Sequence, residues 1–374
     1  MLKQSIFVEA LEKAVGKVIN SSAFGEGFFA LVQGSEGLEL VAAVQGSSPL
    51  EQRWQAKKSL EQDGLKIYLL NMNANNWALV RRYIKWTAPS ACGAKGISIG
   101  IKAVENVDRG ALLGLCQNRM IKPVLADAAP VALEKAKKNF LNLTDEATQA
   151  VFTANWRNGY GANASGLTTE EEIVKALLYG YSMVGFDPSG KIVSRNIKAT
   201  DSSIEKKFSK FPQEFQDALK ASYLGVEFQV GRHKISFSAD EMHRIVLEFG
   251  EVIMHTQFIY NSYLKSTPWP IDFELDIHRP DRPLTPKEHY LIANELERNG
   301  VKITSFLFDC KDNIQDEDLE LHAEIATTFE YRLALDNSDL ANNDWEAFLK
   351  AARNKAHFKV QDIAGAQKLL SKGI

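Results

Sequence analysis

The chain has 374 residues, of which 45% are hydrophobic, and its formal net charge is −3. This length allows one large domain or two to three ordinary ones, with enough core to need no disulfide or structural metal. Because 44 Lys and Arg stand against 47 Asp and Glu, there is no basic excess, and we expect no nucleic-acid partner. The 20 Phe, 6 Trp and 10 Tyr exclude a low-complexity disordered protein.

Cysteine usage and hydropathy indicate the compartment. The three cysteines are widely spaced and fit neither a disulfide framework nor a zinc motif: Cys92, Cys116 and Cys310. Free thiols are typical of a reducing compartment. The N-terminal segment carries Glu9 and Glu12 and lacks the apolar core of a signal peptide. No run approaches the roughly 18 apolar residues that span a bilayer. We therefore expect a cytoplasmic protein with no membrane partner.

The predicted elements begin with a β-hairpin, formed by residues 28–33 and 38–44 around a Gly-Ser-Glu-Gly turn. Short apolar runs then alternate with amphipathic helical stretches, which is typical of a parallel α/β sheet. Eight such strand-helix units favour a (β/α)8 TIM-like barrel over an open sheet. The eight candidate strands are residues 66–70, 97–101, 122–126, 183–187, 272–277, 303–308, 332–335 and 357–360.

Two regions divide the predicted fold. Residues 1–62 form an N-terminal hairpin and helix region packed on the barrel, and residues 63–374 form the barrel itself. Residues 195–238 read as an insertion between barrel units. Within it, two alternating segments around Gly231 predict a small hairpin.

Acidic residues follow many of the predicted strands. Active sites of barrels lie at the carboxyl ends of the strands, and here those ends carry Asp127, Asp187, Asp309, Asp336 and Asp362. Such a rim repels itself unless its carboxylates are paired, protonated or bridged by a cation. A divalent metal (Mg, Mn or Zn) is therefore possible. The alternative is that Asp simply serves as a turn or N-cap residue after each strand.

The fifth predicted strand, residues 272–277, carries an unusual polar face. Asp272, Glu274 and Asp276 alternate with apolar residues, and His278 continues the same face. In a barrel this face points into the lumen, which branched apolar residues normally fill. Glu274 and Asp276 are then candidates for proton transfer and His278 for a metal or substrate contact. The alternative is an exposed edge strand with one wet face.

One segment resembles the phosphate-binding loop of nucleotide-binding proteins but lacks part of its motif. Residues 185–191 read GxxxxGK after a strand, but a phosphate-binding loop needs Ser or Thr next, and this chain has Ile192. No clear helix start follows, and no GxGxxG is present. We predict a Pro-Ser-Gly loop at this position, and no nucleotide cofactor.

Several segments resemble the tagaturonate/fructuronate epimerase family: residues 87–93, 159–163, 175–183, 185–187, 273–275 and 284–296. The resemblance covers much of the chain from about residue 85 to 310. It implies a metal-dependent enzyme that inverts a hydroxyl-bearing carbon of a keto-uronate. Retro-aldol and aldol steps through a metal-stabilised enediolate would serve that reaction, with a small-molecule sugar acid as the partner.

The chemical segments of that family are changed in this chain. Where the family pattern has Ser-Asp-His, supplying a base and a metal ligand, this sequence has Ser189, Gly190 and Lys191. A glycine cannot act as a base, and a lysine ammonium repels a cation. A later His-Ser-Gly segment of the family corresponds to Asp336, Asn337 and Ser338, and a Gly-rich loop to residues 101–104. Glu274 remains as a family acid/base residue.

We therefore favour an enzyme, an isomerase of carbohydrate metabolism with a rebuilt site. In this hypothesis Glu274 and Asp276 move protons, and Lys191 replaces the metal as an electrophile or Schiff-base former. Asp187, Asp309 and Asp336 hold a metal in the other version, through oxygen ligands. The substrate contacts are His278, Asp127 and Asn337.

Two other hypotheses stay open on the sequence. A catalytically silent family member would bind a sugar acid or a protein partner without turnover. An NTP-binding protein is the third, and rests on the imperfect GxxxxGK segment alone. A homo-oligomer is possible under all three.

Overall fold

The computed structural model describes residues 4–25, 27–105, 107–117, 119–193, 201–279, 282–308, 316–336 and 349–371. A closed barrel of eight parallel strands forms its centre, in the order β12-β13-β14-β15-β6-β7-β8-β9. This confirms the predicted α/β barrel. The strands are β6 Ile97–Ile101, β7 Ile121–Ala128, β8 Gly161–Leu167, β9 Met183–Phe186, β12 Asp272–Ile277, β13 Ser305–Phe308, β14 Arg332–Asp336 and β15 Ala356–Val360.

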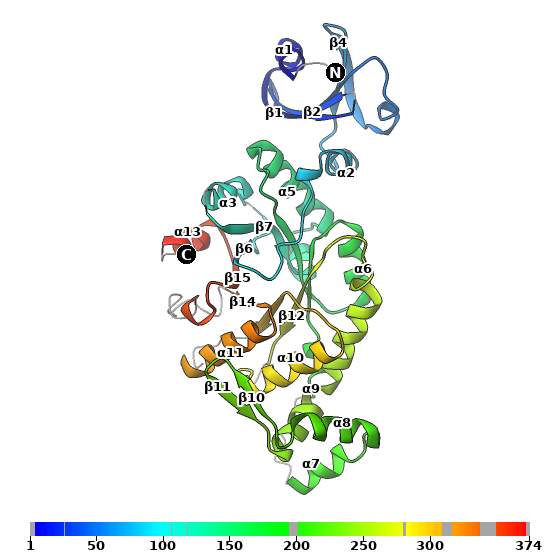
Figure 1. Cartoon of the computed structure of the whole chain (residues 1–374). Helices are drawn as coiled ribbons and strands as arrows, with labels where there is room; N and C mark the ends of the chain where they lie inside the picture. The colour runs from blue at the N-terminus through cyan, green and yellow to red at the C-terminus, as the bar shows by residue number, and fades with distance from the viewer. Residues whose placement is uncertain are drawn as a thin grey trace.

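Helices follow the strands and cover the outside of the barrel (Figure 1): α3 Arg109–Cys116, α4 Pro130–Lys135, α5 Phe140–Ala154, α6 Glu170–Leu178, α9 Ala239–Ile259, α10 Pro286–Arg298, α11 Asp316–Thr328 and α13 Ile363–Ser371. Capping boxes begin four of them, at Asn139, Thr169, Ser238 and Thr285. In each, the cap side chain accepts a backbone N–H of the first turn, which has no partner within the helix.

The N-terminal region is a five-stranded antiparallel sheet in the order β1-β2-β3-β5-β4. The expected hairpin is present as β2 and β3, joined by a tight turn between Gly34 and Gly37. Helix α1 covers one face of the sheet, and α2 together with Phe152 of α5 covers the other, so this second core joins the sheet to the barrel (Figure 1). The elements are α1 Gln4–Ala14, β1 Lys17–Phe24, β2 Gly27–Gly34, β3 Gly37–Gln45, β4 Ala56–Gln62, β5 Leu65–Leu70 and α2 Ala74–Tyr83.

One of the eight predicted barrel strands is wrong. Residues 66–70 lie in β5, which pairs antiparallel with β3 and β4 of the N-terminal sheet. The barrel strand that takes its place is β8, whose sequence GANASGL has no long apolar run. Gly161 shows why small residues are needed there, since a Cβ at this position would lie 2.8 Å from Cys92 Sγ. Because β5 belongs with its sheet partners, we propose a domain boundary after β5 rather than after residue 62.

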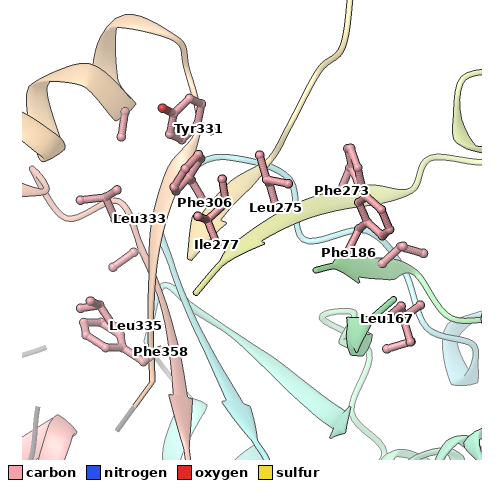
Figure 2. Packing of buried hydrophobic residues seen from close by; sticks show 14 of the residues in the cluster. Leu167, Phe186, Phe273, Leu275, Ile277, Phe306, Tyr331, Leu333, Leu335 and Phe358 are labelled. Atoms are coloured by element: carbon pink, nitrogen blue, oxygen red, sulfur yellow. The ribbon is translucent and has the colours of Figure 1, made fainter. Parts of the chain in front are cut away.

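The residues of each barrel strand alternate between two environments. On β12, the side chains of Phe273, Leu275 and Ile277 are buried in the layer between strands and helices, in one hydrophobic core with Phe306, Leu333 and Phe358 (Figure 2). The intervening residues of β12 face the lumen instead, because successive side chains of a strand point to opposite faces. The outer layer therefore carries the hydrophobic core, and the lumen is left for other residue types.

The region between β9 and β12 contains the predicted inserted hairpin, β10 Glu227–Val230 paired with β11 His233–Ser236. Helices α7 Asp201–Phe208 and α8 Gln213–Tyr223 precede it, and these inserted elements lie at the end of the molecule opposite the N-terminal sheet (Figure 1). Among the described residues, no helix combines the length and the apolar character needed to cross a membrane.

Candidate active site in the barrel lumen

Strand β12 brings three carboxylates into the barrel lumen. Asp272, Glu274 and Asp276 are each at most 2% exposed. Strand β12 pairs with β9 on one side and β13 on the other, so the alternative of a wet edge strand is wrong. Buried carboxylates need compensating partners, because an isolated buried charge is strongly unfavourable. The partners differ for the three residues, and so do the roles that they can play.

Asp272 lies at the start of β12 and has a structural role. Its carboxylate accepts hydrogen bonds from the backbone N–H groups of Cys92 and Gly93, at 2.5 and 3.0 Å. These bonds fasten the segment before β6 across the amino-terminal end of the barrel. Asp272 thus closes the floor of the lumen, away from the carboxyl ends of the strands where barrel enzymes carry their chemistry.

Glu274, in the middle of β12, is held ionised by its neighbours. It forms an ion pair with Lys359 of β15 and accepts hydrogen bonds from Asn163 Nδ2 at 3.1 Å and Ser305 Oγ at 2.8 Å. Burial opposes ionisation, but Lys359 and the nearby His357 outweigh it and lower the pKa of Glu274.

Asp276 lies two residues further along the same face, and its pKa is shifted in the opposite direction to that of Glu274. Its Oδ2 accepts a weak hydrogen bond from Gly166 N at 3.3 Å, and its Oδ1 accepts none from the described residues. Burial raises the pKa of Asp276 to about 7, with Glu274 adding to the shift and Lys359 opposing it. Two neighbouring carboxylates whose pKa values are pushed apart are typical of acid/base catalysis, and the group near pH 7 is the one suited to exchange protons.

Asp127 and His357 complete the polar lumen. His357 Nε2 lies 3.5 Å from Asp127 Oδ2 and 4.0 Å from Glu274 Oε2. Burial by itself would raise the pKa of Asp127, but Lys359 and His357 lower it to about 2. Both carboxylate oxygens of Asp127 are buried and accept no hydrogen bond of good geometry from the described residues. Asp127 is therefore a buried anion with spare acceptors.

A chain of hydrogen bonds from the floor of the barrel orients His357. The guanidinium of Arg332, which is fully buried, donates to Ser98 Oγ at 2.7 Å, and Ser98 Oγ lies 2.7 Å from His357 Nδ1. Since Ser98 already accepts from Arg332, its own hydroxyl proton is free to be donated to Nδ1. This arrangement leaves Nε2–H of the imidazole directed at Asp127 and Glu274.

Two glycines of the wall make space for these acids. A Cβ at Gly185 would lie 3.2 Å from Glu274 Oε1 and 3.4 Å from Asp276 Oδ2. A Cβ at Gly100 would collide with the carboxylate of Asp127. Gly185 of the GFD segment and Gly100 of β6 thus lie where acidic side chains pack directly against the backbone.

Sequence reasoning missed His357 and Lys359, and with them the positive side of the site. A signal was present, because His357, Phe358, Lys359 and Val360 repeat the polar-apolar alternation that singled out the strand at 272–277. The remaining partners, Ser98, Asn163, Ser305 and Arg332, carry no such signal. They are ordinary polar residues whose role depends on the barrel bringing them to Glu274 and His357.

The other sequence-predicted residues lie around this centre. Lys191 is exposed, at the end of the short η3 turn Ser189–Lys191, and its charge acts on His255 of helix α9. Asp187 is half-buried, and its Oδ1 accepts from Ser189 N at 2.8 Å. His278 directly follows β12, and its N–H donates to Ser189 Oγ at 2.8 Å. The catalytic role of Lys191 stays a prediction that none of these contacts supports.

The metal-ligand candidates are only partly within the described chain. Asp336 ends β14 and forms an ion pair with Lys102, while Asp362 caps the first turn of α13 through Gly365 N at 2.8 Å. Asp309, a predicted metal ligand, and Asn337, a predicted substrate contact, lie outside the described residues. The position of Asp362 agrees with the N-cap interpretation.

The described residues do not fit a divalent metal. No group of three or more His, Cys, Asp or Glu side chains among them is placed to hold an ion. Glu274 instead forms an ion pair with the ammonium of Lys359, on which the charges of Asp276 and Asp127 also act, and Asp336 is paired with Lys102. Because each of these lysines already supplies the positive charge that a bound cation would bring, a cation there would be repelled.

Comparisons with known proteins give the family. The tagaturonate epimerase family profile matches residues 20–366. Tagaturonate/fructuronate epimerase of Thermotoga maritima is 26% identical over 316 residues, covering 81% of this chain but only 64% of its own length. The chain thus spans somewhat less than two thirds of that relative.

Solved structures agree with the sequence comparison. The native fructuronate-tagaturonate epimerase UxaE from Cohnella laeviribosi has a TM-score of 0.80 and 26% identity, covering 95% of this chain and 74% of its own. Its complex with one glycerol has a TM-score of 0.81 over the same shares. The sequence profile spans both the N-terminal sheet and the barrel, and these structures share the fold of nearly the whole chain. The chain therefore belongs to the tagaturonate epimerase family.

Proposed function

We propose that the chain is a carbohydrate epimerase that acts on a keto-uronate through acid/base, retro-aldol-type chemistry in the barrel lumen. One observation carries the proposal. Buried polar atoms without hydrogen-bond partners in the described chain gather beside the Glu274–Lys359 pair: Asp127 Oδ1 and Oδ2, Asn163 Oδ1, Asp276 Oδ1 and His357 Nε2. Buried polar groups are normally satisfied, so such a cluster suits a ligand with many hydroxyl groups.

The reaction needs proton transfer and no net oxidation. A base removes the proton of the hydroxyl on the carbon β to the ketone, the bond between the α and β carbons breaks, and its electron pair forms an enediolate. The aldehyde so released turns its other face, the α carbon attacks again, and the proton returns to the new alkoxide. The product is an isomer of the substrate that differs in configuration at one carbon, so the reaction consumes no oxidant, reductant or second substrate.

The lumen residues suit distinct parts of this reaction. Asp276, with a pKa raised by burial to about 7, is the proposed proton acceptor and donor. Glu274 stays ionised and positions Lys359 and Asn163. Asp127 and the Nε2–H of His357 are proposed contacts to substrate hydroxyl groups. His278 and the outlying Asn337 stay proposed substrate contacts at the carboxyl end of the barrel.

Proton NMR of the purified chain with D-tagaturonate tests the proposal. We expect the signals of D-fructuronate to grow at a rate that scales with protein concentration. Conversion that is absent, and that no candidate divalent metal (Mg²⁺, Mn²⁺ or Zn²⁺) restores, would remove the epimerase proposal. Conversion that Asp276→Asn leaves unchanged would keep the activity but remove Asp276 from the mechanism.

A catalytically silent binding protein is the second candidate, favoured by one observation. Both oxygens of Glu274, the family acid/base residue, are occupied by Lys359, Asn163 and Ser305. Calorimetric binding of D-tagaturonate with no conversion in the NMR assay would select this function. A cytoplasmic location is a further proposal, supported by the free thiols of Cys92 and Cys116.

A further inference from the structure

Lys359 is the unusual residue of the lumen. It lies on β15, the last barrel strand, and is only 2% exposed. Its ammonium pairs with Glu274, and the charges of Asp276 and Asp127 also act on it. A lysine is rarely buried so completely, and one that serves only to neutralise Glu274 would not require two further acids around it.

We propose that the Lys359 ammonium takes the electrostatic role of a divalent cation and stabilises the enediolate oxyanion of a metal-independent reaction. This inference rests on the proposed epimerase function and extends it to the means of charge stabilisation. Lys359, and not the exposed Lys191, then occupies the electrophilic position of the site.

The geometry supports a fixed charge. An ammonium has three N–H donors, and in the described part of the chain Glu274 is the single carboxylate within ion-pair distance of Nζ. Donors therefore remain for an oxyanion that develops beside Glu274. Such donors are effective in a buried site, because they are oriented before the reaction and screened from water.

A Schiff base is the less suitable role for the same lysine. Forming one needs a neutral amine, which attacks the ketone and releases water. Burial would favour the neutral amine, but Glu274, Asp276 and Asp127 outweigh it and raise the pKa of Lys359. The amine thus stays protonated at neutral pH, as an electrostatic catalyst requires and a nucleophile does not.

The decisive experiment uses the wild-type chain after exhaustive dialysis against EDTA, with metal content measured by inductively coupled plasma mass spectrometry. We expect NMR conversion of D-tagaturonate to persist in the metal-free protein, with a rate unchanged within about twofold by added Mn²⁺, Zn²⁺ or Mg²⁺. Loss of conversion on chelation and its return with one of these metals would overturn the inference while leaving the proposed function intact. Absence of conversion under every condition would instead remove the proposed function.

Variants at position 359 add a second readout. Lys359→Met should lower kcat by about 10² to 10³-fold, the effect of removing one oxyanion donor, whereas Lys359→Arg should retain part of the activity. Calorimetry in EDTA measures the binding of D-tagaturonate even where there is no turnover, and the affinity should be at least about tenfold weaker in Lys359→Met. Wild-type binding that requires added metal would contradict the inference.

Controls separate the charge effect from misfolding. Lys138→Met removes a lysine that is only partly buried and is paired with Glu146 outside the lumen, and it should leave both readouts unchanged. If Lys359→Met does not fold, Lys359→Met combined with Glu274→Gln removes both charges of the pair and permits the binding measurement. Metal-free binding by this double variant that equals the wild type would also contradict the inference.

Discussion

The two faces of the barrel wall use the same strands for opposite purposes. On β12, the outward Phe273, Leu275 and Ile277 pack into a continuous apolar layer (Figure 2), while the inward Glu274 and Asp276 lie among buried charges. The outer layer also holds a pair of buried histidines, His289 and His322, which burial keeps neutral. The comparison teaches that burial alone does not define a site: the outer face buries groups to stabilise the fold, and the lumen buries charges that stay available to a ligand.

The histidine pair of the outer layer illustrates the neutral case. His289 Nδ1 lies 2.8 Å from His322 Nδ1, and His289 Nε2 lies 2.5 Å from the hydroxyl of Tyr331. His322 Nε2 lies 3.1 Å from Leu284 O. Burial lowers the pKa of both imidazoles, that of His322 to about 4. These groups are mutually satisfied, unlike Asp127 in the lumen.

The largest expected effect separates two acids of the same strand. Asp276→Asn should lower kcat about 10² to 10⁴-fold, because it removes a proton acceptor without changing the shape of the side chain. Asp272→Asn is the matched control: it is buried on the same face but bonds Cys92 and Gly93 at the floor. Its activity per folded molecule should stay near wild type. Equal losses in both variants, measured by NMR conversion, would show that the lumen acts as one structural unit.

Substitutions on the outer face should lower the stability of the protein and leave its activity unchanged. Leu275→Ala should lower the free energy of unfolding by about 2–5 kcal/mol, since it opens a cavity in the apolar layer. Urea unfolding followed by circular dichroism measures the change. Leu178→Ala is the control, because Leu178 is 77% exposed and its truncation should cost no more than about 0.5 kcal/mol. A catalytic defect in the folded Leu275→Ala protein would contradict the division between the faces.

Titratable groups on the two faces should change the free energy of unfolding with pH in opposite directions. Burial lowers the pKa of His322 from 6.5 to about 4, so its contribution to stability is lost as pH falls from about 6.5 towards 4. Burial raises the pKa of Asp276 from 3.8 to about 7, so its contribution is present below about pH 4 and lost as pH rises through 7. Each group contributes at most about 1.4 kcal/mol per pH unit.

Urea unfolding between pH 4.5 and 7.5 measures these slopes in the wild type and in two single variants. Relative to the wild type, His322→Gln should lose less stability as the solution is acidified, and Asp276→Asn should lose less as it is made alkaline. Parallel curves for the wild type and Asp276→Asn would show that Asp276 does not titrate near pH 7 in the folded protein.

The smallest effect is expected outside both faces. Lys191→Ala should change kcat by no more than about threefold, because surface substitutions alter free energies by roughly 0.5 kcal/mol. The NMR assay used for Asp276→Asn measures it, with Lys359→Met as the comparison. A large loss in Lys191→Ala would restore the sequence-based assignment of the electrophile to the segment after β9.

The site was predictable only where its signal lay within one strand. The alternation of Asp272, Glu274 and Asp276 predicted a polar lumen face, and the structure confirms their inward, buried positions. The same pattern at His357 and Lys359 does not by itself indicate a site, since a histidine and a lysine are common on wet strand faces. Strand β8 has no apolar run that would predict a strand, because its wall position next to Cys92 and Val124 requires small residues.

The sequence by itself determined the fold class, the strand-helix alternation, the inserted hairpin and the presence of acids on the inward face of β12. Each of these follows from local periodicity, which the chain carries regardless of its partners. The tertiary structure decided that β5 leaves the barrel and that β15, near the end of the chain, closes it beside β6. Only that closure brings Lys359 to Glu274 and His357 to Asp127, because contacts across a barrel depend on which strands are neighbours and not on any pattern within one of them.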